Sequence, residues 1–215
     1  MIEHVYTRAA DVPGVSAVIV ATDDERIAEA VTRFGGIVRM TRLTHRTGLE
    51  RVAEVAADLD CDIVVNVQGD EPLLEPRMVT EVVDALDADD SVQMSTLRKQ
   101  ISNPADTTDP HVVKVVVDLH GDALYFSRAT VPCVHDATRP AFRHIGLYAY
   151  RRAFLCDVAG LPQTPLELAE SLEQLRALEH GFRIRVVETH YDSIGVDTPG
   201  DLERVRRQMT IEARA

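Results

Sequence analysis

The sequence predicts an α/β fold, on three observations. Short runs rich in valine and isoleucine, such as Ile-Val-Val-Asn-Val at residues 63–67, are typical of strands buried on both faces of a parallel sheet. Stretches with a helical spacing of apolar residues lie between these runs, as in right-handed β-α-β units. A glycine turn between two further apolar runs indicates a hairpin. We therefore expect a Rossmann-like, mainly parallel sheet flanked by helices, with a β-rich hairpin or lid insertion.

Length and composition indicate a globular protein of one domain. The chain has 215 residues, of which 45% are hydrophobic and 27% are charged, enough to bury one sizeable core. We expect a single domain over residues 1–215, in which about 112–150 form a β-rich part. The formal net charge of −12 argues against a nucleic-acid-binding protein, because such proteins present basic surfaces.

Cysteine content and hydropathy predict a location in the cytoplasm. The three cysteines, Cys61, Cys133 and Cys156, are odd in number and widely spaced, as in proteins with reduced thiols. No apolar run approaches the length of a membrane span, and the first residues do not resemble a signal peptide. We therefore expect a cytoplasmic protein that does not bind membranes.

The first third of the chain predicts strands linked by helices. It opens on a helical pattern, where a doubly wound domain usually opens on a strand and a glycine-rich loop. The next helix is expected to end at Gly35 and Gly36, because glycine readily adopts the left-handed conformation that ends helices. In chain order we expect helix 2–10, strand 17–23, helix 27–34, strand 37–41, helix 49–59 and strand 63–67.

The remaining chain continues the alternation and adds the hairpin. His120-Gly121-Asp122 forms the expected hairpin turn. A long helix is expected from Thr164 to Gly181, since Thr164, Pro165 and Glu167 have the spacing of a capping box with proline at the first helical position. In chain order we expect helix 77–86, strand 92–97, loop 101–110, strands 112–118 and 123–128, strand 143–150, helix 151–161, helix 164–181, strand 184–188 and helix 202–209.

Two carboxylates follow the apolar strand at 63–67 directly, in Gly69-Asp70-Glu71-Pro72. Ligands of open α/β sheets bind outside the carboxyl ends of the strands, so Asp70 lies where chemistry is expected. A carboxylate there suits a hard cation such as Mg²⁺ together with phosphate. The alternative is an ordinary turn whose acids face water.

Asp197 is the second candidate carboxylate, because it also follows an apolar strand and could reach the same edge. Asp70 and Asp197 with substrate oxygens would make an open Mg²⁺ site that retains waters. The alternative is that Asp197 only helps to cap the last helix.

Arg128 and His144 are expected on neighbouring strands, where they could bind a substrate carboxylate, the arginine through a bidentate pair. The alternative is an exposed hairpin arginine and a structural histidine. Glu173 and Gln174 interrupt a leucine-rich helical pattern, which could equally be the solvated face of the helix. The sequence contains no HExxH motif and no CxxC pair.

Taken together, nine segments resemble one family, the 3-deoxy-manno-octulosonate (Kdo) cytidylyltransferases, also called CMP-Kdo synthetases of lipopolysaccharide assembly. They include Asn-Val-Gln-Gly-Asp-Glu-Pro at 66–72 and Arg-His-Ile-Gly-Leu-Tyr at 143–148. The resemblance extends over nearly the whole chain in one order. The matching segments are 20–23, 40–42, 45–51, 65–72, 113–116, 123–132, 143–148, 172–176 and 195–199.

The resemblance implies a nucleotidyltransferase with the sheet of nucleotide-diphospho-sugar transferases. Such an enzyme joins CTP to Kdo, giving CMP-Kdo and pyrophosphate, as the anomeric hydroxyl of Kdo attacks the α-phosphate. The resemblance also implies Mg²⁺ as the cofactor and a homodimer to which the hairpin contributes. The alternatives are a cytidylyltransferase for another sugar acid, such as sialic acid, and an inactive protein that binds a sugar acid.

The resemblance assigns roles residue by residue. It implies that Asp70 and Asp197 hold the metal and act in catalysis. It places the nucleotide beside Thr47, Gly48, Gln68 and Asp70. It places the sugar acid beside Arg128, His144, Tyr148, Glu173 and Gln174.

One departure from the family pattern concerns the start of the sequence. Family members begin with a strand and a basic loop of the type Pro-Ala-Arg-x-x-Ser-x-Arg-x-x-x-Lys-Pro, whereas residues 1–5 here match the helix after that loop. We therefore expect the sequence to be truncated, without a central strand and without cations that stabilise the α-phosphate. We expect no CMP-Kdo formation by the chain as written, and recovery when such a segment is added.

Overall fold

The computed structural model describes residues 1–133, 140–196 and 198–212. The strands are β1 (Ile19–Thr22), β2 (Ile37–Met40), β3 (Ile63–Asn66), β4 (Met94–Gln100), β5 (Lys114–Val117), β6 (Ala123–Ser127), β7 (Phe142–Arg151) and β8 (Arg185–Glu188). The helices are α1 (Ile2–Ala10), α2 (Glu25–Arg33), α3 (Gly48–Ala56), α4 (Pro76–Asp87), α5 (Arg152–Ala159), α6 (Pro165–Glu170), α7 (Leu175–Glu179) and α8 (Pro199–Glu212), with a 3₁₀ turn, η1, at Pro104–Thr107. Each strand and helix lies within a few residues of its predicted position, apart from the split of the helix predicted at 164–181.

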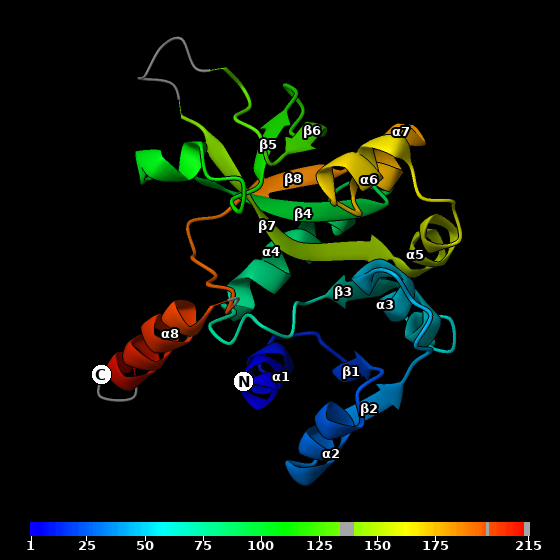
Figure 1. Cartoon of the computed structure of the whole chain (residues 1–215). Helices are drawn as coiled ribbons and strands as arrows, with labels where there is room; N and C mark the ends of the chain where they lie inside the picture. The colour runs from blue at the N-terminus through cyan, green and yellow to red at the C-terminus, as the bar shows by residue number, and fades with distance from the viewer. Residues whose placement is uncertain (134–139, 197, 213–215) are drawn as a thin grey trace.

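A six-stranded sheet forms the centre of the molecule (Figure 1). Its order is β6-β5-β7-β4-β8, and β3 pairs with β7. The predicted α/β class is confirmed, but the strand pairing is mixed rather than mainly parallel. Among the described strands, β4–β8 and the separate pair β1–β2 are the parallel pairs, because β7 enters between β3 and β4 and runs antiparallel to both.

The first two strands form a sheet of their own. β1 pairs with β2 in parallel, while β3 pairs with β7. In the part of the chain that the structure describes, no ladder joins β1 to β3. The prediction of one continuous β-α-β-α-β sheet is therefore wrong at this point, and β1, β2 and α2 lie together below β3 in Figure 1.

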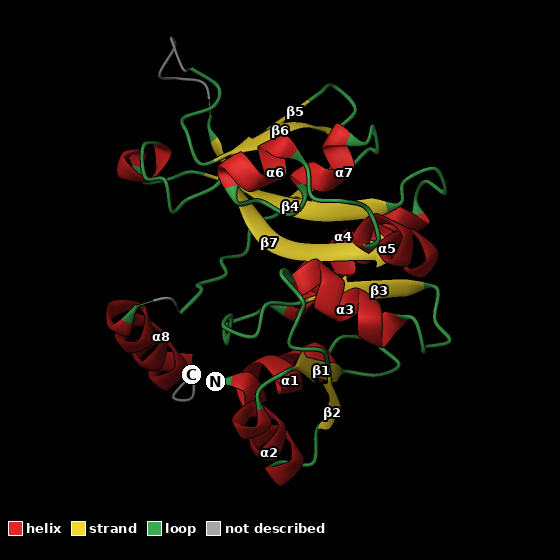
Figure 2. Cartoon of the chain, turned by 45° about the vertical axis from the view of Figure 1, so that its right-hand side comes forward, coloured by secondary structure: helices red, strands yellow, loops and turns green. Residues whose placement is uncertain are grey.

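Two apolar clusters pack against the main sheet, and Figure 2 shows helices on both of its faces. On β7, Tyr148 and Tyr150 belong to the cluster under α3, α5 and α7, whereas Leu147 and Ala149 pack with α1 and α4. Alternating side chains of a strand point to opposite faces, so one strand contributes to both clusters. The aromatic side of β7 therefore faces the beginning of α3, where the candidate site lies.

The hairpin prediction is confirmed, since β5 and β6 pair antiparallel. Gly121 makes the turn with φ of +83°, a conformation that glycine adopts without strain. The part at 112–150 contains β5, β6 and β7, which all belong to the main sheet.

Among the described helices, none is both long and apolar enough to cross a bilayer.

The helix predicted from Thr164 to Gly181 is two helices. Its start is confirmed, because Thr164 and Glu167 form the expected capping box. The first helix, α6, stops where Ser171 turns left-handed with φ of 53°, and α7 begins at Leu175. The prediction of one continuous helix is therefore wrong, and residues 172–174 form a turn that brings Glu173 toward α3.

Candidate active site

Three polar side chains lie at alternate positions at and just after the carboxyl end of β3. Asn66 is the last residue of the strand, and Gln68 and Asp70 follow it. Gln68 Nε2 donates to the carbonyl oxygen of Gly146 at 3.3 Å, which ties this end to β7. The carbonyl oxygen of Asp70 accepts from the N–H of Val196 at 3.0 Å. Asp197 lies outside the described residues, but its neighbour Val196 is thus held at Asp70.

Glu71 joins the same two segments. Its Oε2 accepts from the hydroxyl of Ser193 at 2.6 Å. Burial raises the pKa of Glu71, and the hydrogen bond from Ser193 offsets only part of that rise. The described residues hold no group of three or more histidine, cysteine or acidic side chains arranged for a metal ion. A metal here would need Asp70, a residue such as Asp197, and oxygen atoms of the substrate.

The beginning of α3 meets a carboxylate from the turn between α6 and α7. Thr47 is the N-cap, and its side chain accepts from the N–H of Glu50. Glu173 Oε2 accepts from the N–H of Leu49 at 3.0 Å, and Thr47 also hydrogen-bonds this carboxylate. Burial raises the pKa of Glu173 even so, because those hydrogen bonds only partly offset it. The structure thus joins residues predicted for the nucleotide (Thr47) and for the sugar acid (Glu173).

Gly48 leaves open space at the first helical position of α3. A side-chain carbon on Gly48 would meet no atom within 4 Å. Helix N-termini favour anions, since unpaired N–H groups and the helix dipole point toward them. In the structure this anion is Glu173, which accepts from the N–H of Leu49, while Thr47 accepts from the N–H of Glu50.

His144 and Tyr148 lie on β7 beside an aromatic cluster. The centroid of the His144 ring lies 4.9 Å from that of Phe126 and 5.4 Å from that of Tyr148. His144 Nε2 hydrogen-bonds the hydroxyl oxygen of Thr96 at 2.9 Å. Burial lowers the pKa of His144 to about 3, so the ring is neutral at pH 7. His144 therefore contributes hydrogen bonds and shape rather than positive charge.

Tyr148 is only 4% exposed. Its pKa lies well above the usual range, first because of burial and then because of the carboxyls of Glu173 and Glu71. The hydroxyl therefore keeps its proton at neutral pH. Tyr148 and Glu173, both predicted for the sugar acid, thus lie close enough for the charge of one to act on the other.

Arg128 follows β6, and β5 lies between β6 and β7, so the expectation that Arg128 and His144 lie on neighbouring strands is wrong. The guanidinium donates to the carbonyl oxygens of Glu170 at 2.8 Å and Pro110 at 3.1 Å. Lys114, fully buried, donates to the carbonyl oxygen of Arg128 at 2.6 Å. Burial lowers the pKa of Lys114. These contacts fix Arg128 at the end of the hairpin.

Gln174 is 3% exposed, and its Nε2 has no hydrogen-bond partner among the residues the structure describes. It faces a small hollow with the side chain of Tyr150, whose hydroxyl also lacks a described partner. The hollow has no room for a water molecule. Gln174 is therefore buried, rather than on a solvated helix face.

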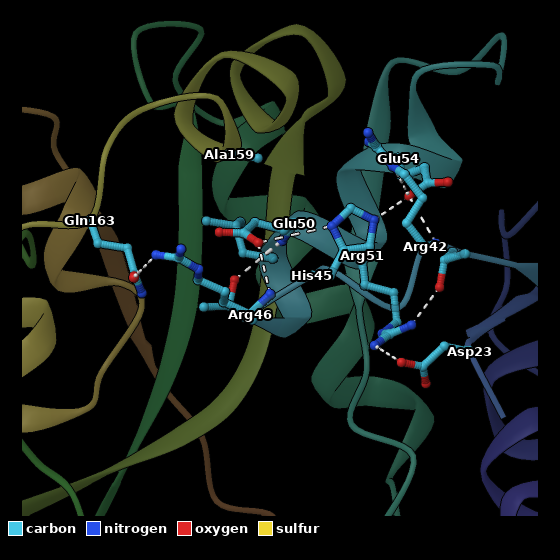
Figure 3. Close-up of polar contacts among 12 residues, drawn as sticks. Asp23, Arg42, His45, Arg46, Glu50, Arg51, Glu54, Ala159 and Gln163 are labelled. Atoms are coloured by element: carbon cyan, nitrogen blue, oxygen red, sulfur yellow. Dashed lines mark hydrogen bonds and ion pairs between the residues drawn. The ribbon is translucent and has the colours of Figure 1, made fainter.

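The basic segment before α3 is neutralised by acids of that helix (Figure 3). His45 lies between Glu50 and Glu54, and Arg42 Nε lies 3.1 Å from Glu54 Oε2. The hydrogen bond from His45, with that from Arg42, lowers the pKa of Glu54 to about 2. Arg51 pairs with an aspartate of the turn after β1, Asp23, at 2.8 Å. These pairs hold the segment that leads to Thr47 against α3.

Sequence reasoning missed several buried polar residues. Asn66, 5% exposed, could have been found from its alternation with Gln68 and Asp70. The ion pair of Glu167 with Arg176 had no signal in the sequence, since its partners are brought together by the turn that separates α6 from α7. Glu167 Oε1 lies 2.6 Å from Arg176 Nη2.

Comparisons of the sequence with known proteins all identify cytidylyltransferases as its relatives. A family model described as "Cytidylyltransferase" matches residues 1–185. A 3-deoxy-manno-octulosonate cytidylyltransferase of Geobacter metallireducens is 55% identical over 222 residues, covering 98% of this chain and 87% of that protein. The relative of the same name from Geotalea uraniireducens is 55% identical over 221 residues, with 97% and 88% covered.

Solved structures give the same picture. A CMP:2-keto-3-deoxy-manno-octonic acid synthetase complexed with CTP superposes with a TM-score of 0.92 at 44% identity, covering 98% of this chain and 88% of that one. A putative glucose-1-phosphate thymidylyltransferase of Bacillus anthracis, at 14% identity and a TM-score of 0.66, shares the fold alone. With relatives more than half identical along nearly its whole length, the chain belongs to the family of 3-deoxy-manno-octulosonate cytidylyltransferases.

Proposed function

We propose that this protein transfers the cytidylyl group of CTP to Kdo, giving CMP-Kdo and pyrophosphate for lipopolysaccharide synthesis. The observation that carries the proposal is the hydrogen bond between Leu49 and Glu173. It joins the helix start expected beside the nucleotide to the turn expected beside the sugar acid. A reaction between two substrates gains most of its rate from holding both in one site.

On the nucleotide side, the proposal assigns Thr47, Gly48, Gln68 and Asp70. The open space beside Gly48 leaves room for part of the nucleotide there. Gln68, bonded to the carbonyl oxygen of Gly146, presents its other amide atoms beside the end of β3. These groups would orient CTP without taking part in bond making.

On the sugar side, the proposal assigns Arg128, His144, Tyr148, Glu173 and Gln174. Arg128 supplies positive charge for the carboxylate of the sugar acid. Neutral His144 and the protonated Tyr148 supply hydrogen bonds to hydroxyl groups. Glu173, whose pKa is raised, can accept hydrogen bonds from hydroxyl groups of the sugar.

The reaction is a single displacement at phosphorus. The anomeric oxygen of Kdo forms a bond to the α-phosphorus of CTP, the bond from that phosphorus to the bridging β-oxygen breaks, and pyrophosphate leaves with the electron pair. The proton of the anomeric hydroxyl passes to solvent water in the same process. The chain's own contribution is to align the attacking oxygen with the leaving group.

We also propose that Asp70 and Asp197 hold a divalent cation, Mg²⁺. Mg²⁺ in proteins is bound by one or two carboxylates together with substrate phosphates, which is the donor set that this pair would offer. The bond from Val196 to Asp70 supports the pairing, because it brings the segment that leads to Asp197 to the end of β3. When bound, the cation would neutralise charge on the phosphates.

The quaternary structure and the location remain proposals too. We propose a homodimer that uses the β5–β6 hairpin, on which Leu119 and Leu124 are exposed at 103% and 62%. We propose a cytoplasmic location, which the free thiols of Cys61, Cys133 and Cys156 support.

The experiment is a pyrophosphate-release assay with CTP, Mg²⁺ and either Kdo or sialic acid. With the family's basic N-terminal segment added, we expect release with Kdo on the order of 10²-fold faster than with sialic acid, little release by Asp70→Asn, and little release by the chain as written. Faster release with sialic acid would favour a sialic-acid cytidylyltransferase. Binding of Kdo without release would favour the inactive sugar-acid-binding protein.

A further inference from the structure

Asn66 is a buried amide that the proposed function does not use. It is the last residue of β3 and is 5% exposed. Its Nδ2 is shielded from solvent and has no hydrogen-bond partner within the described part of the chain. Folded proteins rarely leave such a donor unpaired, because the group loses its hydrogen bonds to water and gains none. The Asn66 donor therefore calls for a partner that the described residues do not supply.

The register of the sheet places Asn66 on the face that holds the candidate site. Asn66 lies directly opposite Tyr148 on β7, and Tyr148 lies opposite Thr96 on β4. Side chains directly opposite each other in antiparallel strands point to the same face. Asn66 thus shares a face with Tyr148, under the beginning of α3.

Tyr148 lies in a mainly apolar and aromatic cluster, which the carboxyl of Glu173 reaches. The carboxyl of Glu173 acts on Tyr148 strongly enough to raise the pKa of its hydroxyl further. The same carboxyl is held by the N–H of Leu49. Asn66 therefore adds a hydrogen-bond donor to a face that already offers an acceptor, Glu173, and a protonated hydroxyl.

Four other buried side chains of the described residues carry a donor atom without a described partner: Arg98, Tyr150, Thr164 and Gln174. Arg98 already bonds Glu188 through Nη2, and Thr164 is the N-cap of α6. Tyr150 and Gln174 line a hollow too small for a water molecule. Of these donors, Asn66 is the one at the end of β3, and ligands of α/β sheets bind at the carboxyl ends of strands.

We propose that Asn66 is a further substrate-contacting residue, whose Nδ2 donates a hydrogen bond to an oxygen atom of the sugar acid. The inference rests on the proposed function. Gln68, two residues on, is turned to the carbonyl oxygen of Gly146 and is assigned to the nucleotide. The position of Asn66 opposite Tyr148 assigns it to the sugar acid instead.

The test is the substitution Asn66→Leu, which keeps the size of the side chain and removes the unpaired donor. We expect KM for Kdo to rise about tenfold while KM for CTP stays unchanged. We expect the Tm of the free protein to stay the same or rise, because a buried polar group without a partner is lost. Titration calorimetry with Kdo alone should show the same loss of affinity.

A control and a second variant keep the test decisive. Gln93→Leu removes an amide whose Nε2 is already bonded to the carbonyl oxygen of Asp90, and it should change neither KM. Asn66→Asp keeps the shape but faces the anionic sugar acid with a carboxylate, so it should weaken Kdo binding even if the leucine variant does not fold.

Three results would overturn the inference. An unchanged KM for Kdo in a folded Asn66→Leu protein would remove Asn66 from the sugar site. A fall in Tm with no change in KM would show a purely structural role. A rise confined to KM for CTP would assign the donor to the nucleotide. If the unaltered protein bound no Kdo, the proposed function would fail instead.

Discussion

Arg176 has the largest of the fully buried side chains in the described structure. Its guanidinium makes a two-pronged contact with Glu167, through Nε at 2.9 Å and Nη2 at 2.6 Å. Burial alone would raise the pKa of Glu167, but the hydrogen bonds from Arg176 and from the N–H of Thr164 outweigh it and lower the pKa. The pair joins α6 to α7 and so supports the turn that carries Glu173.

Glu167→Gln should destabilise the protein by about 3 kcal/mol, because it removes the two-pronged carboxylate partner of a buried guanidinium and leaves Glu50, 3.6 Å away, as its ion-pair partner. Urea unfolding would measure the free energy of unfolding. The matched control is Glu203→Gln, which removes the exposed partner of Arg206 on α8 and should change stability by less than about 1 kcal/mol. Equal effects of the two variants would contradict the account of the buried pair.

Some of the candidate site could be predicted residue by residue. Asp70 is predicted as a site residue because a carboxylate follows an apolar strand directly, and this reasoning needs only local sequence. The neutral state of His144 could not be predicted, since it follows from burial between Phe126 and Tyr148. The Glu173–Leu49 bond joins residues 124 positions apart, so no local pattern indicates it.

Helices were predictable at their starts and less so at their ends. The capping box of Thr164 and Glu167 is a local signal, and the structure confirms it. The end of α6 is set by distant partners: Glu170 accepts from the hydroxyl of Ser127 and the N–H of Arg128 at the end of β6. The leucine spacing that predicted one helix takes no account of these contacts.

Strands were predictable, and their pairing was not. Runs of valine and isoleucine located β1, β2 and β3, but nothing in them distinguishes a neighbour along the chain from a distant one. The ten-residue strand β7 pairs with β3, β4 and β5. Its insertion turned a predicted parallel arrangement into a mixed sheet, because pairing is decided by packing across the whole molecule.

At the scale of the whole molecule, the proposed dimer is open to direct measurement. Light scattering during gel filtration should give about 48 kDa, twice the 23.8 kDa of the chain. Leu124→Glu should lower that mass toward one chain, since it places a charge on the exposed face of the hairpin. The control is Ile211→Glu on α8, where the side chain is 69% exposed against 62% for Leu124, and it should leave the mass unchanged. A mass of one chain for the unaltered protein would contradict the proposal.

The central claim is that one site joins CTP to Kdo. Phosphorus NMR of the protein with the family's basic N-terminal segment added, mixed with CTP, Kdo and Mg²⁺, tests it most directly, because it follows each phosphorus atom. The account predicts loss of the three CTP signals, appearance of pyrophosphate, and one phosphodiester signal coupled to carbon atoms of Kdo. Unchanged CTP, or conversion to CDP and phosphate without a Kdo phosphodiester, would contradict it.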